Sequence, residues 1–323
     1  MSFVTILAWI LGLALVTVVA LLGYFVLATR RIAAQAEKLV PASGHFVEIA
    51  GNRIHYIEAG TGRPIVFLHG LGGQLHHFRH TLFERLSGDF RLIALDRPGS
   101  GYSVRAAAGT GRLSEQAEVV ARFIDALGLE KPLIVGHSLG GSVALATALE
   151  HGDKISGLAL LSPLTHLEDA VPPAFRLMYI PSPWRRRLIA NTVGVPRSLK
   201  HANQTLDFVF GPQKAPEDYA IGAGGLVGLR PSHFLASLDD FMAIEHDLGR
   251  LEARYEELAM PVGVMFGTAD RVINYERNGL ALQGRIAGLD LELINGMGHM
   301  PQFAEPDRVE AFIRRMAAKS FAA

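Results

Sequence analysis

The chain opens with a long apolar run. Residues 3 to 29 contain no charged side chain and are rich in Leu, Val, Ala and Ile. About 20 apolar residues span the hydrocarbon core of a bilayer, so this run can cross one with some tilt. The alternative is a cleaved signal peptide, which has a basic start and an apolar core of about 7–15 residues. Met1-Ser2 carries no basic side chain, so we predict a retained single-pass membrane anchor over residues 1–30.

Basic residues follow the apolar run and none precedes it. Arg30, Arg31 and Lys38 stand directly after the predicted span. The positive-inside rule then places the bulk of the chain, including any catalytic domain, in the cytoplasm. Residues 31–43 are expected to form a linker. The catalytic core is expected to begin at the hairpin after it and to owe none of its predicted contacts to the span.

Beyond this linker, short apolar strands alternate with helical patterns. A hairpin is expected around Gly51-Asn52, with Val47 and Ile49 facing Ile54 and Tyr56. Further strands are expected at residues 64–68, 92–95, 133–135, 158–161, 262–266 and 291–294. Helices are expected at 113–127, 139–150 and 275–287, followed by a final helix with the apolar stripe Val309, Phe312, Ile313 and Met316. This alternation predicts an α/β fold with a mostly parallel sheet and helices on both faces.

The alternation stops between residues 163 and 258. This stretch is too long for a simple connection and contains short helical patterns, so it is interpreted as a helical cap inserted into the core. The expected organisation is therefore a transmembrane anchor (1–30), a linker (31–43), a first core part (44–162), the cap (163–258) and a second core part (259–323).

A serine stands where one predicted strand turns into a helix. The sequence GHSLG around Ser138 fits G-x-S-x-G, in which the serine sits on a sharp turn and its neighbours must be small. This turn raises the hydroxyl above the sheet. It also places the backbone N–H of Leu139 at a helix N-terminus, where it can face a developing oxyanion. The strand before and the helix after it are the context that the motif requires, so Ser138 is the predicted nucleophile.

A serine nucleophile needs a base and an acid that orients the base. His299 follows the last predicted strand and Asp270 follows the strand before it, in the chain order Ser, Asp, His that α/β-hydrolases use. Asp247 is the alternative acid, and an N-cap ahead of the next helix is the alternative role for Asp270. The second oxyanion donor is expected at the N–H of Leu71, in the loop after residues 65–68. His69 is expected to shape that loop by hydrogen bonding.

Together these motifs resemble the α/β-hydrolase superfamily. HG-x-GG, D-R-P-G-x-G-x-S, G-H-S-x-G-G, G-x-x-D and G-H-x-P-x-x-x-E-x-P occur in this order over about residues 44 to 318. Within it, the serine esterase and lipase branch is most similar, notably the membrane-anchored monoacylglycerol lipases. Haloalkane dehalogenases and epoxide hydrolases share the DRPGSGYS stretch, but their resemblance implies a carboxylate nucleophile where this chain has Ser138.

Composition narrows the chemistry further. Lys plus Arg equals Asp plus Glu at 31 each, which gives no sign of a nucleic-acid partner. The absence of cysteine excludes disulfides and thiolate chemistry. His76, His77 and His80 could suggest a metal site, but no carboxylate or fourth histidine is nearby in the sequence. They are interpreted as a helix face, and no metal or cofactor is predicted. The sequence does not indicate an oligomeric state.

The prediction is a membrane-anchored serine hydrolase that cleaves a lipophilic carboxylic ester through an acyl-enzyme. Carbon–carbon bond hydrolysis or acyl transfer on the same triad, or a non-enzymatic ligand-binding role, remain alternatives. One cap segment has two interpretations. Trp184 with Arg185, Arg186 and Arg187 is either a solvated helix start or a surface that meets anionic lipid.

Overall fold

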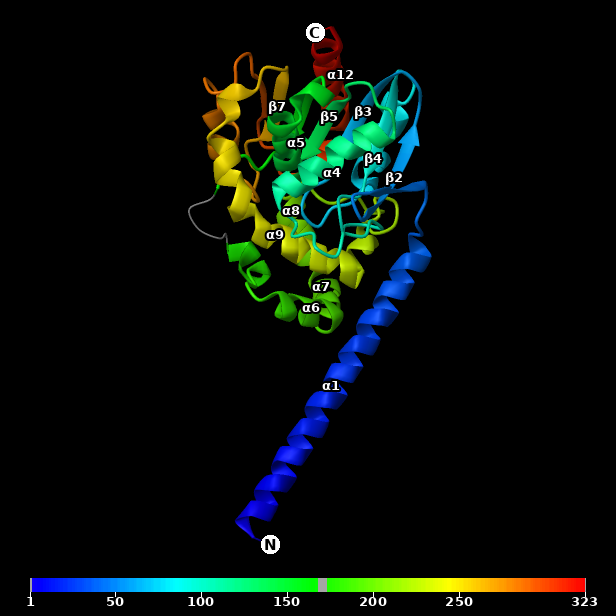
Figure 1. The fold of residues 1–323 in the computed structure, drawn as a ribbon, viewed down its shortest axis with the longest axis vertical. Coiled ribbons are helices and arrows are strands. Elements are labelled where there is room, and N and C mark those ends of the chain that lie inside the picture. The colour runs from blue at the N-terminus through cyan, green and yellow to red at the C-terminus, as the bar shows by residue number, and fades with distance from the viewer. Residues whose placement is uncertain (1, 168–172, 323) are drawn as a thin grey trace.

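The computed structural model describes residues 2–167 and 173–322, which form one large sheet, its covering helices and a long projecting helix (Figure 1). In these residues eight strands pair in the order β1-β2-β4-β3-β5-β6-β7-β8. Their bounds are β1 His45–Ile49, β2 Asn52–Ala59, β3 Arg63–Leu68, β4 Phe90–Leu95, β5 Leu133–His137, β6 Gly157–Leu161, β7 Val262–Gly267 and β8 Asp290–Ile294. Only the β1–β2 and β2–β4 pairs are antiparallel. The expected mostly parallel α/β sheet is confirmed.

The first two strands form the expected hairpin with one difference in register. Val47 pairs with Ile54, Ile49 pairs with Asn52 and Tyr56 pairs with His45, so the turn lies at Ala50-Gly51 and not at the expected Gly51-Asn52. The turn is tight because Ala50 and Gly51 both adopt positive φ angles. The turn is centred one residue earlier than expected, so each residue of β1 pairs with the residue two positions before the one expected in β2.

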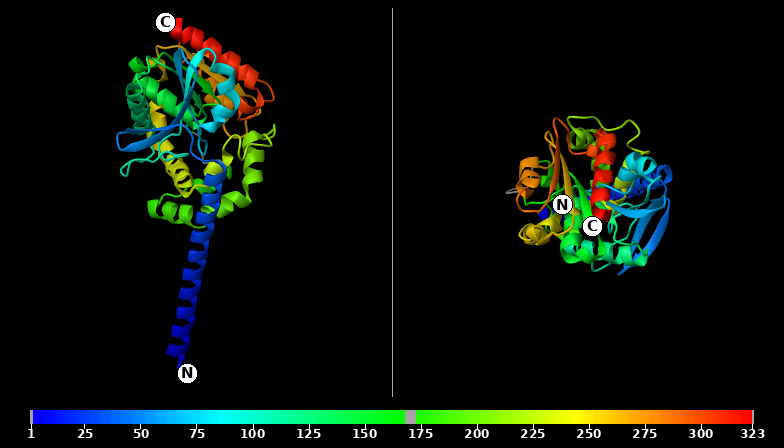
Figure 2. Two further views of the ribbon diagram at one scale, coloured as in Figure 1. Left: turned by 90° about the vertical axis from the view of Figure 1, so that its right-hand side faces the viewer. Right: turned by 90° about the horizontal axis from the view of Figure 1, so that it is seen from above.

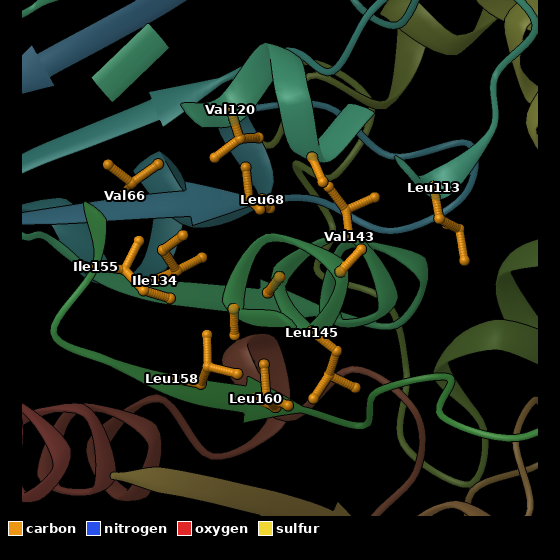
Figure 3. Close-up of a cluster of buried hydrophobic side chains, with 14 of the residues drawn as sticks. Val66, Leu68, Leu113, Val120, Ile134, Val143, Leu145, Ile155, Leu158 and Leu160 are labelled. Carbon is orange, nitrogen blue, oxygen red and sulfur yellow. The ribbon is translucent and has the colours of Figure 1, made fainter. Parts of the chain in front are cut away.

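The sheet has an apolar core on each face. On one face α4 (Leu113–Ala126) and α5 (Leu139–Glu150) pack over alternate residues of the central strands, and Figure 3 shows part of that cluster. On the other face α12 (Pro306–Ala322) packs with the helical segment made of α2 (His76–Phe78), η1 (Arg79–Phe83) and α3 (Glu84–Leu86). The predicted stripe of α12 is buried at all four positions: Val309, Phe312, Ile313 and Met316.

The expected helix at 275–287 is wrong as a continuous element. A helix α10 covers only Tyr275–Asn278, and a single turn η6 follows at Leu280–Leu282. Asn278 is fully buried and its side-chain Oδ1 accepts hydrogen bonds from the backbone N–H groups of Thr165 and His166. Gly279 follows it and Gly284 adopts φ +81°, so two glycines interrupt the helical backbone within six residues.

The cap lies between β6 and β7 and is helical where it is described. Its elements are η3 Pro173–Met178, α6 Pro183–Asn191, α7 Gly194–Lys200, α8 Ala202–Phe210, η4 Gly225–Leu229, α9 Pro231–Glu252 and η5 Tyr255–Glu257. Residues 168–172 of the expected cap lie outside the described residues. Helix α9 runs from the cap back along the core, where it contacts α4 and α5.

Helix α1 (Phe3–Leu39) is longer than the predicted anchor and includes most of the expected linker. An 18-residue apolar window within it is fully exposed, and the helix is long and apolar enough to cross a membrane. Figures 1 and 2 show it projecting from the end of the body that carries α6 and α7, with the C-terminus at the opposite end.

The last turns of α1 are docked on the folded body. Thr29, Ala33 and Ala36 are buried, and the Thr29 hydroxyl donates to the backbone oxygen of Thr192 at 2.6 Å. Glu37 forms an ion pair with Arg230 at 2.7 Å. These contacts join α1 to the cap, where small side chains on one face of α1 fit against α6, α7 and η4, and the sequence analysis did not anticipate them.

Candidate active site

Ser138 sits at the tip of the turn between β5 and α5. Its backbone has φ 53° and ψ −121°, a conformation that L-residues rarely adopt and that surrounding structure must enforce. The Ser138 N–H donates to Leu161 O of the neighbouring strand at 3.0 Å, and its carbonyl accepts from Gly141 and Leu164. These bonds hold the strained turn in place.

Glycines let the loop after β3 approach this turn. A Cβ on Gly70 would lie 2.9 Å from Cβ of Ser138, and one on Gly140 would lie 2.1 Å from the carbonyl oxygen of Leu68. The loop that carries Leu71 therefore lies directly against the start of α5. The backbone N–H groups of Leu71 and Leu139 donate to no protein acceptor within the described residues, so both are free to bind an oxyanion.

Asp270 and His299 form a hydrogen-bonded pair after the last two strands. Asp270 Oδ2 lies 2.8 Å from His299 Nδ1, and both side chains are almost fully buried. Asp270 Oδ1 accepts from the N–H groups of Val272 and Ile273 at 2.8 and 2.9 Å. The carboxylate thus caps the following turn and orients the imidazole at the same time, so the two roles considered for Asp270 are compatible. His299 Nε2 is the nitrogen left for proton transfer.

His137 connects the serine turn to the histidine loop. Its Nε2 donates to the backbone oxygen of His299 at 2.9 Å, and the two rings lie 4.9 Å apart. Burial holds the pKa of His137 well below its ordinary value of 6.5, so the ring is neutral. The described structure contains no hydrogen bond between Ser138 Oγ and His299 Nε2; such catalytic bonds are often long before substrate binds.

The loop that carries Leu71 is held by buried polar groups, and His69 is the one among them that the sequence analysis identified. His69 lies with Nδ1 2.8 Å from Gly70 O, and its Nε2 accepts from the backbone N–H of Arg97 at 2.9 Å. Burial keeps the pKa of His69 far below 6.5, which matches a neutral ring with its proton on Nδ1. His69 therefore shapes the loop as expected.

Arg97 and Asp96, from the DRPGSGYS stretch, complete this support. Asp96 accepts from the N–H of Leu75 and from His55 Nδ1, at 2.9 and 2.7 Å. Arg97 is fully buried and pairs with Asp240 of α9 at 2.7 Å. Two adjacent charged residues at the end of an apolar strand could have drawn attention to Asp96 and Arg97. The sequence does not show the partner of Arg97, because Asp240 lies 143 residues further along the chain.

Other candidates lie in different places. Asp247 accepts from the N–H and hydroxyl of Ser114 at 3.0 and 2.9 Å, so it secures the start of α4 and is not the partner of His299. His77 Nε2 lies 3.0 Å from the Tyr219 hydroxyl of the cap, and burial lowers the pKa of His77 to about 3. Within the described residues no group of three His, Asp or Glu side chains is arranged as a metal site.

The three cap arginines are not equivalent. Arg186 donates to Asp239 at 2.5 Å and to Ile180 O at 2.8 Å, so it joins α6 to α9 and does not face outward with its neighbours. Trp184, Arg185 and Arg187 are exposed. The interpretation that all three arginines meet lipid is wrong for Arg186, because the half-buried carboxylate of Asp239 on α9 binds it.

The sequence and the structure were compared with those of known proteins to identify the family of the fold. The chain is 25% identical over 263 residues to a 2-hydroxy-6-oxo-6-phenylhexa-2,4-dienoate hydrolase of Comamonas testosteroni, a match that covers 79% of this chain and 87% of that protein. It is 35% identical over 153 residues to a dihydrolipoyllysine-residue acetyltransferase component of an acetoin cleaving system of Cupriavidus necator. That match covers 47% of this chain and spans only 40% of the relative's length.

The structure is similar to that of a bacterial membrane phospholipase A, with 23% identity, a TM-score of 0.69 and coverage of 96% of this chain and 98% of the other. This likeness extends over nearly the whole chain, including most of α1. The family model of the alpha/beta hydrolase fold matches residues 63–306, which include the serine turn, the Asp270–His299 pair and the cap. The chain belongs to the α/β-hydrolase fold family.

Proposed function

We propose that this protein is a membrane-anchored serine hydrolase that cleaves carboxylic esters of lipophilic acyl groups. The observation that carries the proposal is the strained Ser138 turn packed against a free pair of N–H groups, with a buried Asp270–His299 pair beside it. This arrangement suits acyl transfer to a serine hydroxyl.

In the proposed reaction His299 Nε2 removes the proton from Ser138 Oγ as the oxygen attacks the ester carbonyl. The carbonyl oxygen becomes negatively charged and accepts hydrogen bonds from the N–H groups of Leu71 and Leu139. His299 then gives its proton to the leaving alcohol, while Asp270 stabilises the imidazolium and keeps its tautomer. Water, activated by the same histidine, hydrolyses the acyl-enzyme and restores the serine. These steps require no cofactor.

The lipid bilayer is the proposed partner, and the docked end of α1 indicates which face meets it. The hydrogen bond from Thr29 to Thr192 joins the end of the apolar run to the end of α6. Helix α6 would therefore lie at headgroup depth once α1 spans the bilayer. Exposed Trp184 and Leu188, with Arg185 and Arg187, suit that depth. A lipophilic substrate could then reach the cap directly from the membrane.

The basic residues Arg30 and Arg31 support a cytoplasmic position for the folded body in this proposal. Its test is to insert the full chain in oriented vesicles and to ask whether protease digests the body from the outside. Inverted membrane vesicles expose the cytoplasmic face, so protease should digest the body there without detergent. Digestion only after detergent treatment would place the body on the opposite side.

The experiment for the activity is a substrate screen with full-length protein in detergent micelles. The substrates are p-nitrophenyl esters of graded chain length, monoacylglycerols and phospholipids, and Ser138→Ala is the control. Ester hydrolysis that rises with acyl length and disappears in the variant supports the proposal. An inactive parent, or an equally active variant, overturns it.

Carbon–carbon bond hydrolysis is the second candidate. It is favoured by the similarity to the Comamonas testosteroni hydrolase, which extends over 79% of this chain. The same screen includes 2-hydroxy-6-oxo-6-phenylhexa-2,4-dienoate. Turnover of this compound without ester hydrolysis would replace the ester proposal by the carbon–carbon one.

A further inference from the structure

Among the buried ion pairs, one connects the cap to the proposed oxyanion loop. The guanidinium of Arg97 is fully buried. Some of its nitrogens bind the loop after β3, and another binds α9 of the cap and α4 of the core. Nε donates to His69 O at 2.9 Å and Nη2 donates to Gly70 O at 3.1 Å. Nη1 donates to Asp240 Oδ2 at 2.7 Å and to Gln116 Oε1 at 2.6 Å.

The carbonyl of Gly70 belongs to the same peptide group as the N–H of Leu71. A trans peptide is planar, so a group that fixes the carbonyl oxygen also fixes the direction of the N–H on the opposite side. Gly70 O is held by Arg97 Nη2, by His69 Nδ1 at 2.8 Å and by the N–H of Gly73 at 3.1 Å. A charged donor on the carbonyl also polarises the peptide and makes its N–H a stronger donor.

Asp240 keeps this guanidinium in place from the cap. It lies on α9, is almost fully buried and accepts from Arg97 and also from Arg105. A buried guanidinium without its carboxylate would carry an uncompensated charge, and it would move toward other acceptors or water. The position of Arg97 against Gly70 therefore depends on how α9 packs against the core, because α9 carries Asp240.

From this geometry we infer that Arg97 and Asp240 are positioning residues for the oxyanion donor at Leu71, and that the cap sets the strength of that donor through them. The inference rests on the proposed function, in which the Leu71 N–H binds the oxyanion. A cap that shifts when lipid substrate enters would alter the Asp240–Arg97 contact, and through it the orientation of the Gly70–Leu71 peptide.

Arg105 provides a matched control for this inference. It shares the carboxylate of Asp240 and is mostly buried, though less completely than Arg97. Its other contact is with Pro98 O at 2.8 Å and not with the loop that carries Leu71. Replacing Arg105 perturbs the same ion cluster and leaves the bonds from Arg97 to His69 O and Gly70 O intact.

The test compares Arg97→Gln, Asp240→Asn and Arg105→Gln in the full-length protein. The readout is the rate of a p-nitrophenyl ester relative to its thionoester, in which sulfur replaces the carbonyl oxygen and accepts hydrogen bonds poorly. Losing one oxyanion donor costs about 10²–10³ in kcat, so partial misorientation in Arg97→Gln is expected to cost about 10–10² with the ester. The loss with the thionoester should be several-fold smaller, so the ratio of the two rates falls. Asp240→Asn should act in the same direction by about 3–10-fold, and Arg105→Gln should leave the ratio unchanged.

A merely structural role would lower the active fraction and both rates alike, which would leave the ratio at the parent value and overturn the inference. Arg97→Gln removes a buried charge, so it could fail to fold. In that case the milder variant Asp240→Asn decides the test.

Calorimetric binding of an alkylboronic acid, which forms a tetrahedral adduct with a serine, provides a second readout. If the parent cleaves no ester but binds the boronate, and the variants at 97 and 240 bind it more weakly, the proposed function fails and the positioning role stands. If the parent cleaves esters and the ratios are unchanged, the proposed function stands and the positioning role fails.

Discussion

The carboxyl edge of the sheet and the cap side of the molecule position their side chains in different ways. Ser138, Asp270 and His299 each follow a parallel strand within five residues of its end. In the cap and the docked part of α1, the decisive contacts join distant segments, such as Arg186 with Asp239 and Thr29 with Thr192. Backbone topology alone brings the first group together, whereas the second group depends on how helices pack. The edge of the sheet should therefore carry the chemistry, and the cap side should modulate it.

The largest expected effects concern the edge of the sheet. Ser138→Ala and His299→Ala should each lower kcat by about 10⁴ or more, because these residues act as a unit. Asp270→Asn should lower kcat by about 10⁴, since an amide favours the wrong tautomer of His299. Steady-state hydrolysis of a short p-nitrophenyl ester measures all three.

The matched cap variant is Asp247→Asn. It removes the carboxylate that holds the start of α4 and should lower the melting temperature without abolishing turnover. Near-parent activity in Asp270→Asn together with inactivity in Asp247→Asn would reverse the assignment of the acid.

The second prediction divides α1 into its two parts. Deleting residues 3–27 removes the exposed part and should leave both stability and short-ester activity close to the parent. Deleting residues 3–40 also removes the docked part, with the buried Thr29 bond and the packing of Ala33 and Ala36. This should cost about 3 kcal/mol of stability. Urea unfolding of the two truncated proteins measures the difference, and equal stabilities would mean that the docked part contributes nothing.

The third prediction concerns the histidines between the core and the cap. Burial lowers the pKa of His77 to about 3 and of His233 to about 4, while the unfolded chain titrates near 6.5. The unfolded state therefore binds more protons at acidic pH. The stability contributed by the neutral rings is complete above pH 6.5 and is lost as the pH falls toward their folded pKa values.

For His77 alone this loss should be about 2 kcal/mol between pH 7.5 and pH 5. His77→Gln retains an acceptor for the Tyr219 hydroxyl and removes the titration, so its unfolding free energy should fall less over the same range. Urea unfolding at both pH values gives the comparison. A variant with the full pH dependence of the parent would show that other groups control acid stability.

The smallest expected effect concerns the surface of α6 that is proposed to face lipid, which carries Trp184, Arg185 and Arg187. The chain has two tryptophans, Trp9 and Trp184, so Trp9→Phe leaves Trp184 as the only reporter. In proteoliposomes, brominated lipids should quench it. Arg185→Ser with Arg187→Ser should reduce turnover of an embedded lipid ester several-fold in anionic vesicles, since each arginine contributes about 1 kcal/mol near the surface.

The control variant carries Arg308→Ser and Lys319→Ser on α12, at the other end of the body (Figure 1). It has the same change of net charge and should turn over the embedded substrate as the parent does. Unquenched Trp184 emission would identify α6 as a solvated helix.

Much of the core could be predicted from the sequence because its determinants are local. The apolar runs and the glycines around Ser138 specify strands and a sharp turn without knowledge of any distant residue. The elements that could not be predicted depend on partners far along the chain. Asn278 ends its helix because it bonds Thr165 and His166, and Arg97 takes its position from Asp240. From the sequence alone, the docked end of α1 resembles an ordinary basic linker. Its docking could not be predicted because it depends on the surface of the cap, which forms only in the folded protein.

The central proposal is an activated nucleophile at Ser138, and covalent labelling tests it most directly. Full-length protein in detergent is treated with a fluorophosphonate, and the labelled peptide is located by mass spectrometry. The account predicts one adduct, on Ser138, which forms slowly in Asp270→Asn and is absent in Ser138→Ala. An unlabelled parent, or equal labelling of the Ser138→Ala variant, would contradict it.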